Sequence, residues 1–504
     1  MVLDQYTQNI IIRNSKELVK NAKINSENGY IATVSALSEI NTPDNLAKKQ
    51  IISPGFINLH SHLAYTHLDL KPKNLFAWLK DLMHKVQNES FDPVTASLAG
   101  ARLALSTGTT FLIDNTSHLD ASVKAFQQTG LRGIIGLELF GSDPQQAKSI
   151  LNKAVEELRL VTQSHKIQFA LSPHSLYSVS SELLEEIQVF LAKDSSASHI
   201  LPLLLMHFAE DELEEKYFRG VDFERNQNTG DRALQKYHLT PDDMEGLLIN
   251  EDKELELLYD FWESLGVLDL KKRYRKQAES SWDYFKKYVL SAESGAYPRS
   301  LKYLLTHAIN LSENEIQELA NHSEISLVSC PRSNQFLKHN TAQVALWEQS
   351  CGVNYGLGTD SKASNYDLDL RSELKLLVEN AGSAGIGVQR QHHEDTVAER
   401  ASSRLRRTND RSVLKVHEDH EDDENAGIGV QRQYELLTSA AAKAIGMDDK
   451  IGSLEEAKYA DYVVFEVMDD NLDLDSVDPY ALILDGEKTR VKEVYVGGDL
   501  VHRS

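Results

Sequence analysis

Several histidines and acids of this chain stand where apolar runs end, which is where parallel strands present catalytic side chains. His60 and His62 close the run INLHSH, and His207 closes the run LPLLLMH. Glu210 follows His207 by three residues, and Asp360 stands in YGLGTDS. Imidazole and carboxylate groups are common protein ligands of zinc and iron. These residue types therefore indicate a metal centre with an acid beside it.

The spacing of His60 and His62 is the strongest of these signals. Alternate residues of a strand point to the same side, so the two imidazoles can reach one ion. Two exposed histidines on an edge strand are the alternative, but the preceding SPGFINL is apolar and bounded by Gly and Pro. We therefore expect both histidines to be metal ligands.

His207 and Asp360 would complete the ligand set. A histidine after so apolar a run is either a core residue or a ligand, and the neighbouring H-x-H pair favours the ligand. Asp360 could also cap a helix, and the two roles are compatible. Three histidines and one carboxylate leave room for a water whose pKa the ion lowers, and Asp360 could accept the proton of that water. No lysine ends the middle strands LELFGS and ALSPHS, so we expect a single metal.

Four residues are candidates for proton transfer and substrate contact. Glu210 could deliver a proton if burial raises its pKa, or it could simply favour a helix N-terminus. His307, after YLLT, could polarise the group under attack, and His174, in SPHSLYS, could contact the substrate. A structural histidine is the alternative for both. Arg332, in CPRSN, could bind an anionic or polar substrate group, or form a surface ion pair.

Eight apolar runs predict the fold that positions these residues. They end near His62, Asn115, Phe140, His174, Glu210, His307, Asn334 and Asp360. Buried, β-branched-rich strands belong to parallel sheets covered on both faces, and helix-like segments separate these runs. Most intervals lie near the roughly 30 residues per unit of a (β/α)₈ barrel, whose catalytic groups lie at the carboxyl ends of its strands. We therefore predict an α/β fold, with a metal-dependent (β/α)₈ (TIM) barrel over residues 51–446.

Both ends of the chain carry strand patterns. Residues 1–50 contain two apolar strand candidates around Glu27-Asn28-Gly29, a hairpin-type turn signal. Residues 447–504 are equally rich in strand patterns and are punctuated by glycine. We predict that the two segments form one small β-sandwich beside the barrel.

Two insertions interrupt the predicted barrel. The interval between His207 and His307 is about 70 residues longer than one barrel unit requires. Its excess, at about 215–290, has the pattern of an amphipathic helical insertion, either a surface element or a lid. The octapeptide AGIGVQRQ occurs at 384 and again at 426, with a charge-dense stretch between the copies. Low apolar content and dense charge predict a disordered insertion at about 384–433.

Composition narrows the classes of partner. The 504 residues include 53 Lys and Arg against 76 Asp and Glu, a formal charge of −23. This excess of acidic side chains disfavours general binding of nucleic acid or anionic membranes. A small-molecule substrate in a local pocket is the partner that we expect. The chain has 2 cysteines, no signal-peptide pattern and no long apolar stretch, which predicts a cytoplasmic protein without disulfides or membrane spans. Whether the protein forms a homo-oligomer stays open.

Nine stretches of the chain, taken in order, resemble the amidohydrolase superfamily in its aminohydrolase/chlorohydrolase branch. They are PGFINLHSHL, GTTFLIDN, SPHSLYSVS, HFAEDELEE, THAINLSENEI, SCPRSN, LGTDSKASN, IGSLEEAKYADYVVF and VKEVYVGGDLV. The resemblance implies a barrel flanked by a β-sandwich. It implies that the four ligands named above hold one divalent metal, Zn²⁺ in preference to Fe²⁺. It also implies Glu210 and His307 as the proton-handling pair, with His174 lining the substrate site.

Within that branch the chain is most similar to deaminases of adenine-type rings, including methylthioadenosine/adenosylhomocysteine deaminases and aminofutalosine deaminases. The segment HSHLAYTHLDLKPKNLFAWLKDL matches the aminofutalosine group, although that group tends to carry an acid where this chain has Ala64. The C-terminal G-K-x-A-D pattern also has Ala457 in place of its glycine. The resemblance implies an aminohydrolase for an aminofutalosine-, methylthioadenosine- or adenosylhomocysteine-like substrate.

The expected reaction is an attack by metal-bound hydroxide on the ring carbon that bears the amino group. Asp360 would take the hydroxide proton, Glu210 would protonate a ring nitrogen, and His307 would steady the oxygen. Chlorohydrolase-like, guanine-deaminase-like and amide-cleaving reactions at the same site stay open. A metal-binding protein without turnover is the alternative from a different class.

Overall fold

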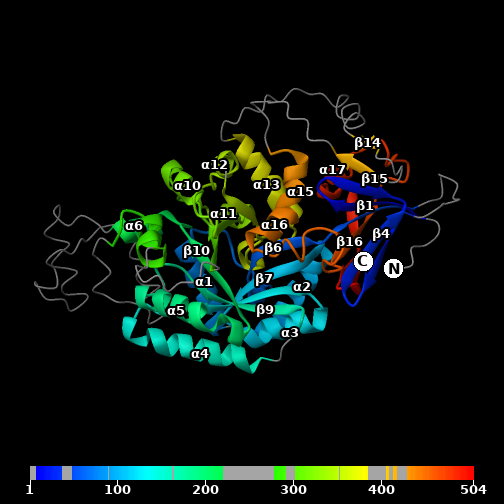
Figure 1. Ribbon diagram of the computed structural model, residues 1–504. Coiled ribbons are helices and arrows are strands. Elements are labelled where there is room, and N and C mark those ends of the chain that lie inside the picture. Colours follow the sequence, from blue (N-terminus) through cyan, green and yellow to red (C-terminus); the bar gives the residue numbers. More distant parts are fainter. Residues whose placement is uncertain are drawn as a thin grey trace, which may run out of the picture.

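A parallel sheet of eight strands lies at the centre of the computed structural model (Figure 1). The structure describes residues 7–36, 48–88, 90–161, 164–219, 277–290, 301–350, 352–383, 405–407, 413–416 and 428–504. The strands are β6 (Phe56–Ser61), β7 (Thr109–Thr116), β8 (Arg132–Leu139), β9 (Ile167–Pro173), β10 (Ile200–Phe208), β11 (Lys302–His307), β12 (Ile325–Ser329) and β13 (Asn354–Leu357). Consecutive strands pair in parallel, and a bridge between Ser61 and Asp360 brings the last strand back to the first. The predicted (β/α)₈ barrel is confirmed.

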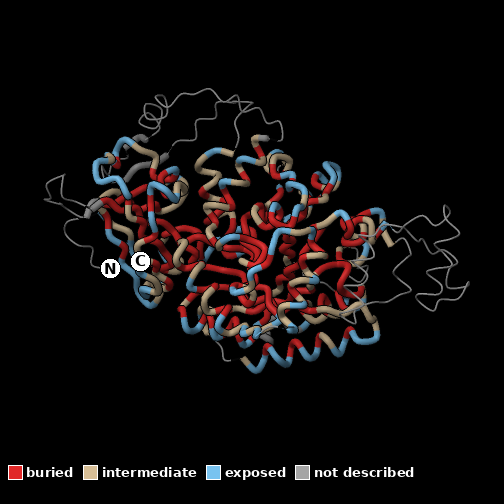
Figure 2. The backbone as a smooth tube through the Cα atoms, turned by 180° about the vertical axis from the view of Figure 1, so that it is seen from behind, coloured by how far each residue is buried: buried red, intermediate tan, exposed pale blue. Residues whose placement is uncertain are grey.

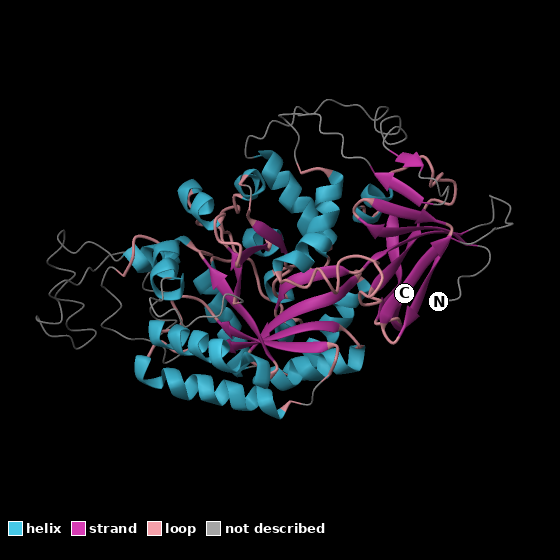
Figure 3. Cartoon of the chain, viewed as in Figure 1, coloured by secondary structure: helices cyan, strands magenta, loops and turns pink. Residues whose placement is uncertain are grey.

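Helices cover the outside of the barrel, as Figure 3 shows. They include α2 (Pro93–Ser106), α3 (Leu119–Thr129), α4 (Ala147–Leu160), α5 (Ser181–Ser198), α10 (Glu313–Leu319), α12 (Val344–Gln349), α13 (Leu370–Ser383), α15 (Val430–Leu437) and α16 (Ser439–Ala444). Local sequence sets where they begin. Ser180 accepts a hydrogen bond from the Leu183 backbone N–H at 3.1 Å, and Ser312 forms a capping box with Glu315.

The alternation of residues along the strands produces two apolar layers. In β10, Leu203 and Leu205 belong to one buried cluster, and Leu204 and Met206 belong to another, which packs under the helices. Figure 2 shows this buried centre surrounded by a more exposed surface. His207 continues the face of Leu203 and Leu205, so the alternation turns it toward the barrel interior.

A second, mixed sheet combines strands from both ends of the chain. Its order is β14-β15-β2-β1-β5-β16-β17-β18, beside a two-stranded sheet of β3 and β4. The strands are β1 (Thr7–Asn14), β2 (Glu17–Lys20), β3 (Ala22–Glu27), β4 (Tyr30–Ala36), β5 (Lys48–Pro54), β16 (Tyr462–Val467), β17 (Thr489–Val496) and β18 (Asp499–Arg503). The predicted hairpin turn joins β3 to β4, with positive φ of 53° at Asn28 and 88° at Gly29.

A buried ion pair joins this sheet to the barrel. Arg132, the first residue of β8, places Nε 2.6 Å and Nη2 3.2 Å from the carboxylate oxygens of Asp461. The guanidinium also lies 3.8 Å from the ring centroid of Tyr459. Because both charged side chains are almost fully buried, removal of either partner would leave the other uncompensated. The pair therefore fixes how the sheet sits on the barrel.

The ends of the first predicted insertion are helical. They are α6 (Glu212–Arg219), α9 (Ser281–Phe285) and a π-helical turn η4 (Lys286–Leu290). The two sides pack together, since the rings of Phe218 and Tyr284 lie 4.7 Å apart and the Ser281 backbone N–H donates to Glu215. Residues 220–276 lie outside the described part of the chain, so the lid stays a prediction.

Parts of the second predicted insertion are ordered strands. Within residues 384–433, β14 (Leu405–Arg407) and β15 (Val413–Val416) pair with each other, and β15 extends the mixed sheet along β2. Helix α15 begins at Val430, inside the second octapeptide copy. The insertion therefore includes two described strands, its disorder stays a prediction, and the first octapeptide copy lies outside the described residues. Sheet edges accept further strands readily, which explains how β15 adds to β2.

None of the helices that the structure describes combines the length and apolar character needed to cross a membrane.

Candidate active site

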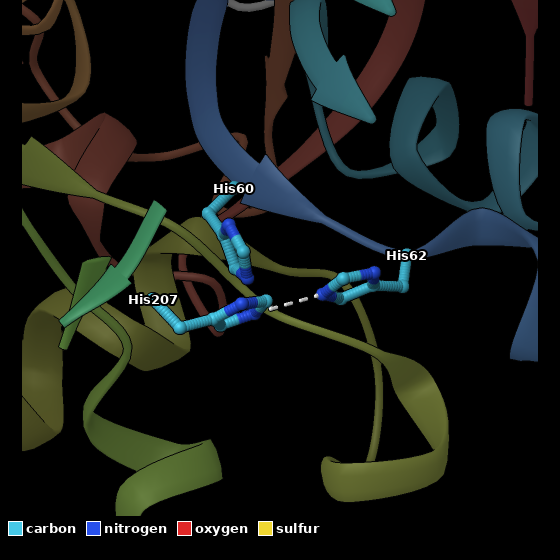
Figure 4. A group of neighbouring side chains, drawn as sticks. All are labelled: His60, His62 and His207. Atoms are coloured by element: carbon cyan, nitrogen blue, oxygen red, sulfur yellow. Dashed lines mark hydrogen bonds between the residues drawn. The ribbon is translucent and has the colours of Figure 1, made fainter. Parts of the chain in front are cut away.

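The four predicted metal ligands converge at the carboxyl ends of the barrel strands. His60 lies in β6, His62 just after it, and His207 in β10, and Figure 4 shows the three rings pointing toward one another. His62 Nε2 lies 3.3 Å from His207 Nε2. Asp360 Oδ1 lies 3.5 Å from His60 Nε2 and 3.6 Å from His62 Nε2. Together these residues form a His-rich metal site.

The chemistry of this donor set fits a divalent cation. His60 Nε2 is buried and has no hydrogen-bond partner within the described residues. The side chains of Asn115 and Thr306 lie 2.9 and 3.3 Å from the other ring nitrogen, Nδ1. His207 Nδ1 donates to the His174 carbonyl oxygen at 2.9 Å, which leaves Nε2 of His207 with its lone pair. Outer partners of this kind orient imidazoles for metal binding.

Burial keeps the histidines in the neutral form that metal binding needs. It lowers the pKa of His60 to about 3 and also lowers the pKa values of His62 and His207. Burial acts to raise the pKa of Asp360, but the adjacent imidazoles of His60 and His62 hold that pKa well below its ordinary value. The site therefore offers three neutral imidazoles and one carboxylate.

Two serine hydroxyls hold the Asp360 side chain. Ser333 Oγ donates to Asp360 Oδ2 at 2.6 Å, and Ser364 Oγ donates to the same oxygen at 2.8 Å. Asp360 has a φ of 55°, in the left-handed region that is uncommon outside glycine. Strain of this kind persists where the surroundings over-determine the backbone, often at functional sites. Because both serines bind Oδ2, Oδ1 is the oxygen that faces the histidines.

Glu210 and His307 lie side by side next to the metal site. Glu210 Oε1 is 3.4 Å from His307 Nε2, and His307 Nδ1 donates to Asn334 Oδ1 at 3.0 Å. His339 Nε2 lies 3.5 Å from the same oxygen of Glu210. Burial acts to raise the pKa of Glu210, but His307 and His339 outweigh it and lower that pKa to about 2. These contacts therefore favour the ionised form of Glu210, and its role in proton delivery stays a prediction.

His174 lies beside the metal site, where the sequence places a substrate contact. Its Nδ1 lies 3.0 Å from Ser178 Oγ, and its ring stacks on Phe140 with centroids 4.5 Å apart. The ring centroid of His207 is 4.7 Å away. Burial holds the pKa of His174 well below its ordinary value, so the ring is neutral.

Arg332 has protein partners that account for its charge. Its Nη1 and Nη2 lie 2.5 and 3.1 Å from the two carboxylate oxygens of Asp367. The Arg332 backbone N–H donates to the buried Glu373 at 2.9 Å. Of the two roles that the sequence allows for Arg332, the contacts fit the ion pair. The Arg332 side chain is largely buried in this pair, and the Asp367 side chain is more exposed. A bidentate pair engages the donors that a substrate anion would need.

Several residues of the site carry no strong sequence signal. Glu138 ends the predicted strand LELF, and its position at a strand end is the clue that could have found it. His339 and Asn334 follow strand β12 by several residues, within or just after helix α11 (Pro331–Phe336), where no apolar run marks them. Asn115 also ends a predicted strand, but an amide there indicates no particular chemistry.

A cleft of about 380 Å³ leads to the acid side of the site. Its lining includes Phe76, Glu210, Leu213, Asn310 and His339. Phe76 belongs to helix α1 (Leu75–Asn88), which follows the metal-binding strand along the chain. The volume falls within the range of small-molecule sites.

Comparison with known proteins places the chain in a family. Residues 51–242 and 272–501 match the amidohydrolase family, and the chain belongs to it. It is therefore a metal-dependent amidohydrolase, a hydrolase of carbon–nitrogen bonds other than peptide bonds that acts on small molecules.

Two relatives with assigned activities are deaminases. The 5′-deoxyadenosine deaminase of Methanosphaera stadtmanae is 22% identical over 424 residues, which cover 82% of this chain and 73% of the relative. The 5-methylthioadenosine/S-adenosylhomocysteine deaminase of Haloquadratum walsbyi is 28% identical over 338 residues, or 64% of this chain and 59% of the relative. The chain thus matches well under the full length of these relatives.

Solved structures share the fold over almost the whole chain. The aminofutalosine deaminase of Helicobacter pylori, in complex with methylthio-coformycin, gives a TM-score of 0.63 at 18% identity, covering 98% of this chain and 99% of that one. An adenosine deaminase of Xanthomonas campestris with bound zinc gives 0.61 at 17% identity, covering 98% and 92%. At these identities the likeness establishes the architecture alone.

Proposed function

We propose that this protein hydrolytically deaminates an adenine-type ring, in a substrate like aminofutalosine, methylthioadenosine or adenosylhomocysteine. The observation that carries the proposal is the position of Glu210 Oε1, 3.4 Å from His307 Nε2, beside the metal site. Deamination needs a group that moves a proton to the ring and a second group that steadies the attacking oxygen. The two relatives described above, which are named as deaminases of 5′-deoxyadenosine and of methylthioadenosine and adenosylhomocysteine, support the same reaction.

The donor set favours one divalent ion, zinc in preference to iron. Three imidazoles and a carboxylate suit zinc, and the structure of the adenosine deaminase relative contains zinc. When bound, the ion would supply Lewis acidity, which makes a water a stronger nucleophile and polarises the bond under attack. His60, His62, His207 and Asp360 would hold it.

Asp360 has the position and the charge of a general base. Its Oδ2 is fixed by Ser333 and Ser364, so only Oδ1 is free to take the proton of the attacking water. Its depressed pKa keeps it ionised before the reaction. The new carbon–oxygen bond forms as this proton leaves the water.

Glu210 acts first as a base and then as an acid. Since its pKa is about 2, it starts as a carboxylate. It accepts one proton of the attacking water, while Asp360 accepts the other, and it then gives its proton to a ring nitrogen. His307 donates Nδ1–H to Asn334, which turns Nε2 toward Glu210 and the reacting oxygen. Transfer of the proton held by Asp360 to the amino group then breaks the carbon–nitrogen bond, and ammonia leaves.

Turnover of a defined panel tests the proposal. Metal-replete protein is incubated with aminofutalosine, methylthioadenosine, adenosylhomocysteine, adenosine and guanine, and conversion of amine to carbonyl is followed by mass spectrometry. Conversion of an adenine-type member supports the proposal and names the substrate. Metal-loaded, folded protein that converts only guanine, or no member at all, overturns it in favour of a guanine-deaminase-like, chlorohydrolase-like or amide-cleaving reaction.

A further inference from the structure

Two buried glutamates stand next to each other on helix α6, where the first predicted insertion begins. Glu214 is 1% exposed and Glu215 is 5% exposed. Acidic side chains are rarely buried to this degree unless they are paired. The proposed reaction uses neither carboxyl group, and their hydrogen bonds lead to different parts of the protein.

Glu214 reaches back from the helix to the loop that carries Glu210. Its Oε2 accepts a hydrogen bond from the Glu210 backbone N–H at 3.0 Å. Its Oε1 is buried and has no hydrogen-bond partner within the described residues. Burial and the nearby Glu215 raise the pKa of Glu214 well above its ordinary value, which favours the neutral acid. One neutral carboxyl group thus holds the Glu210 backbone through a single oxygen.

The peptide group between Ala209 and Glu210 is held on both of its sides. Its carbonyl oxygen, on Ala209, accepts from the backbone N–H groups of Ile309 at 3.0 Å and Asn310 at 2.9 Å. Its N–H, on Glu210, donates to Glu214. Ala209 has a φ of 46°, in the left-handed region that is uncommon outside glycine. An uncommon backbone conformation persists only where its surroundings hold it, so both contacts matter here.

The orientation of this peptide group sets where the Glu210 side chain points. Glu210 Oε1 lies 3.4 Å from His307 Nε2 and 3.5 Å from His339 Nε2. The side chain leaves the backbone directly after the held N–H, so a rotation of the peptide group carries the carboxylate with it. A shift of about 1 Å at a reacting group can slow a reaction by roughly 100-fold. The contact from Glu214 therefore bears on the proton-transfer step.

Glu215 holds a different part of the molecule. Its two oxygens accept hydrogen bonds from the Ser281 backbone N–H, at 3.1 Å, and from the Ser281 hydroxyl. Ser281 begins helix α9, at the far end of the insertion. Glu215 therefore joins the two ends of the insertion, whereas Glu214 joins the insertion to the loop of the proton-transfer group. The two residues match in type, burial and helix, and they differ in what they hold.

We infer that Glu214 is a positioning residue, whose hydrogen bond to the Glu210 backbone N–H aims the Glu210 carboxylate at His307 and at the ring that receives its proton. This inference rests on the proposed deamination and adds to it a residue that acts only through Glu210. Helix α6 is then part of the structure that supports catalysis. The first predicted insertion is therefore anchored at the loop on which proton transfer depends.

Three variants test this role with a nucleoside that the wild-type protein converts. Glu214→Gln keeps an acceptor oxygen in a neutral group of the same shape, so its kcat should stay close to that of wild type. Glu214→Met keeps the length of the side chain but removes the acceptor, so its kcat should fall by roughly 10- to 100-fold with little change in KM. Glu215→Met should lower Tm through loss of the contact with Ser281, with kcat close to that of wild type.

Hydrogen exchange gives a second measurement, which does not depend on turnover. The Glu210 N–H is bonded to Glu214, so a peptide covering residues 208–212 should exchange faster in Glu214→Met than in wild type or Glu214→Gln. Mass spectrometry follows the exchange, and the zinc content of each variant should match wild type. If Glu214→Met does not fold, Glu214→Asp, which withdraws the carboxyl group by one methylene, replaces it with the same expected results.

Several outcomes would overturn the inference. It fails when Glu214→Met keeps either the kcat or the exchange of wild type, or when Glu214→Gln loses as much kcat as Glu214→Met. An equal loss of kcat in Glu215→Met would assign the effect to the stability of helix α6, and loss of zinc in Glu214→Met would assign it to the metal site. Wild type that converts no adenine-type compound instead overturns the proposed function, and the exchange comparison still reports whether Glu214 holds the peptide group.

Discussion

His339 Nε2 lies 3.5 Å from Glu210 Oε1, and the two side chains shift each other's pKa in opposite directions. Burial acts against charge on His339, but hydrogen bonds to Asp211 and Glu210 raise its pKa to about 9. The same contact helps to lower the pKa of Glu210 to about 2. A residue with no obvious signal in the sequence therefore acts with His307 to lower the pKa of the proton-transfer group.

This pair should make stability depend on pH. The raised pKa of His339, about 9 against an ordinary 6.5, stabilises the fold fully below pH 6.5 and ceases to do so as the pH rises through 9. Wild type should therefore exceed His339→Asn in unfolding free energy by on the order of 1–3 kcal/mol near pH 6, and by much less near pH 9.5. Urea denaturation at both values measures this. An equal difference at the two values would contradict the assignment.

Replacing Asp360 with Asn should abolish turnover while the protein stays folded. The amide oxygen of Asn can still accept the hydrogen bonds from Ser333 and Ser364, but the amide cannot take the proton of the attacking water. We therefore expect kcat to fall by about 10²–10⁴-fold. Circular dichroism and thermal melting serve as folding controls. Ser333→Ala, which removes one of two donors to Asp360 Oδ2, should give a smaller loss. Full activity in Asp360→Asn would refute the scheme.

Zinc should stabilise the protein through its histidines. An ion that binds only the folded state adds about 2.7 kcal/mol at a hundredfold excess over Kd. Chelation should lower Tm and activity, and zinc should restore both. The variant His60→Ala should lose the response to zinc, whereas His322→Gln, at a half-exposed ion pair with Glu324, should keep it. A Tm that ignores zinc in wild type would speak against the metal site.

Arg332 should matter for stability rather than for substrate binding. Its bidentate pair with Asp367 is largely buried on the arginine side, so Arg332→Gln should cost about 1–3 kcal/mol and leave KM unchanged. Asp367→Asn should behave similarly, and the double variant should cost less than the sum of the two. A large rise in KM for Arg332→Gln with normal stability would instead support the substrate contact.

Strand ends were the most predictable part of this molecule. Strands such as β7 and β8 are buried over their full length and carry a short apolar run, which is visible in the sequence without any partner. His60, His62 and His207 were predictable because a polar residue that ends such a run stands out. The turn at Asn28 and Gly29 was predictable because few other residues adopt positive φ in a hairpin.

Side-chain partners were not predictable in the same way. Whether Arg332 meets a substrate or Asp367 depends on how a loop folds back over 35 residues of sequence. The charge on Glu210 depends on His339, which follows helix α11 and reaches the site only through the tertiary fold. Local patterns carry no information on such contacts, so the sequence alone could not show how these neighbours act on the pKa of Glu210.

The position of β5 has a consequence for the order of biosynthesis. It leads through Gly55, where an added Cβ would lie 1.9 Å from Thr110 Oγ1, directly into the strand that carries His60. Its neighbours in the sheet are β1, made earlier, and β16, made some 400 residues later along the chain. On a ribosome, β5 therefore stays a half-paired edge until β16 has been made, after all eight strands of the barrel. The set of four metal ligands likewise comes together only when the barrel is complete, because Asp360 follows its last strand, β13.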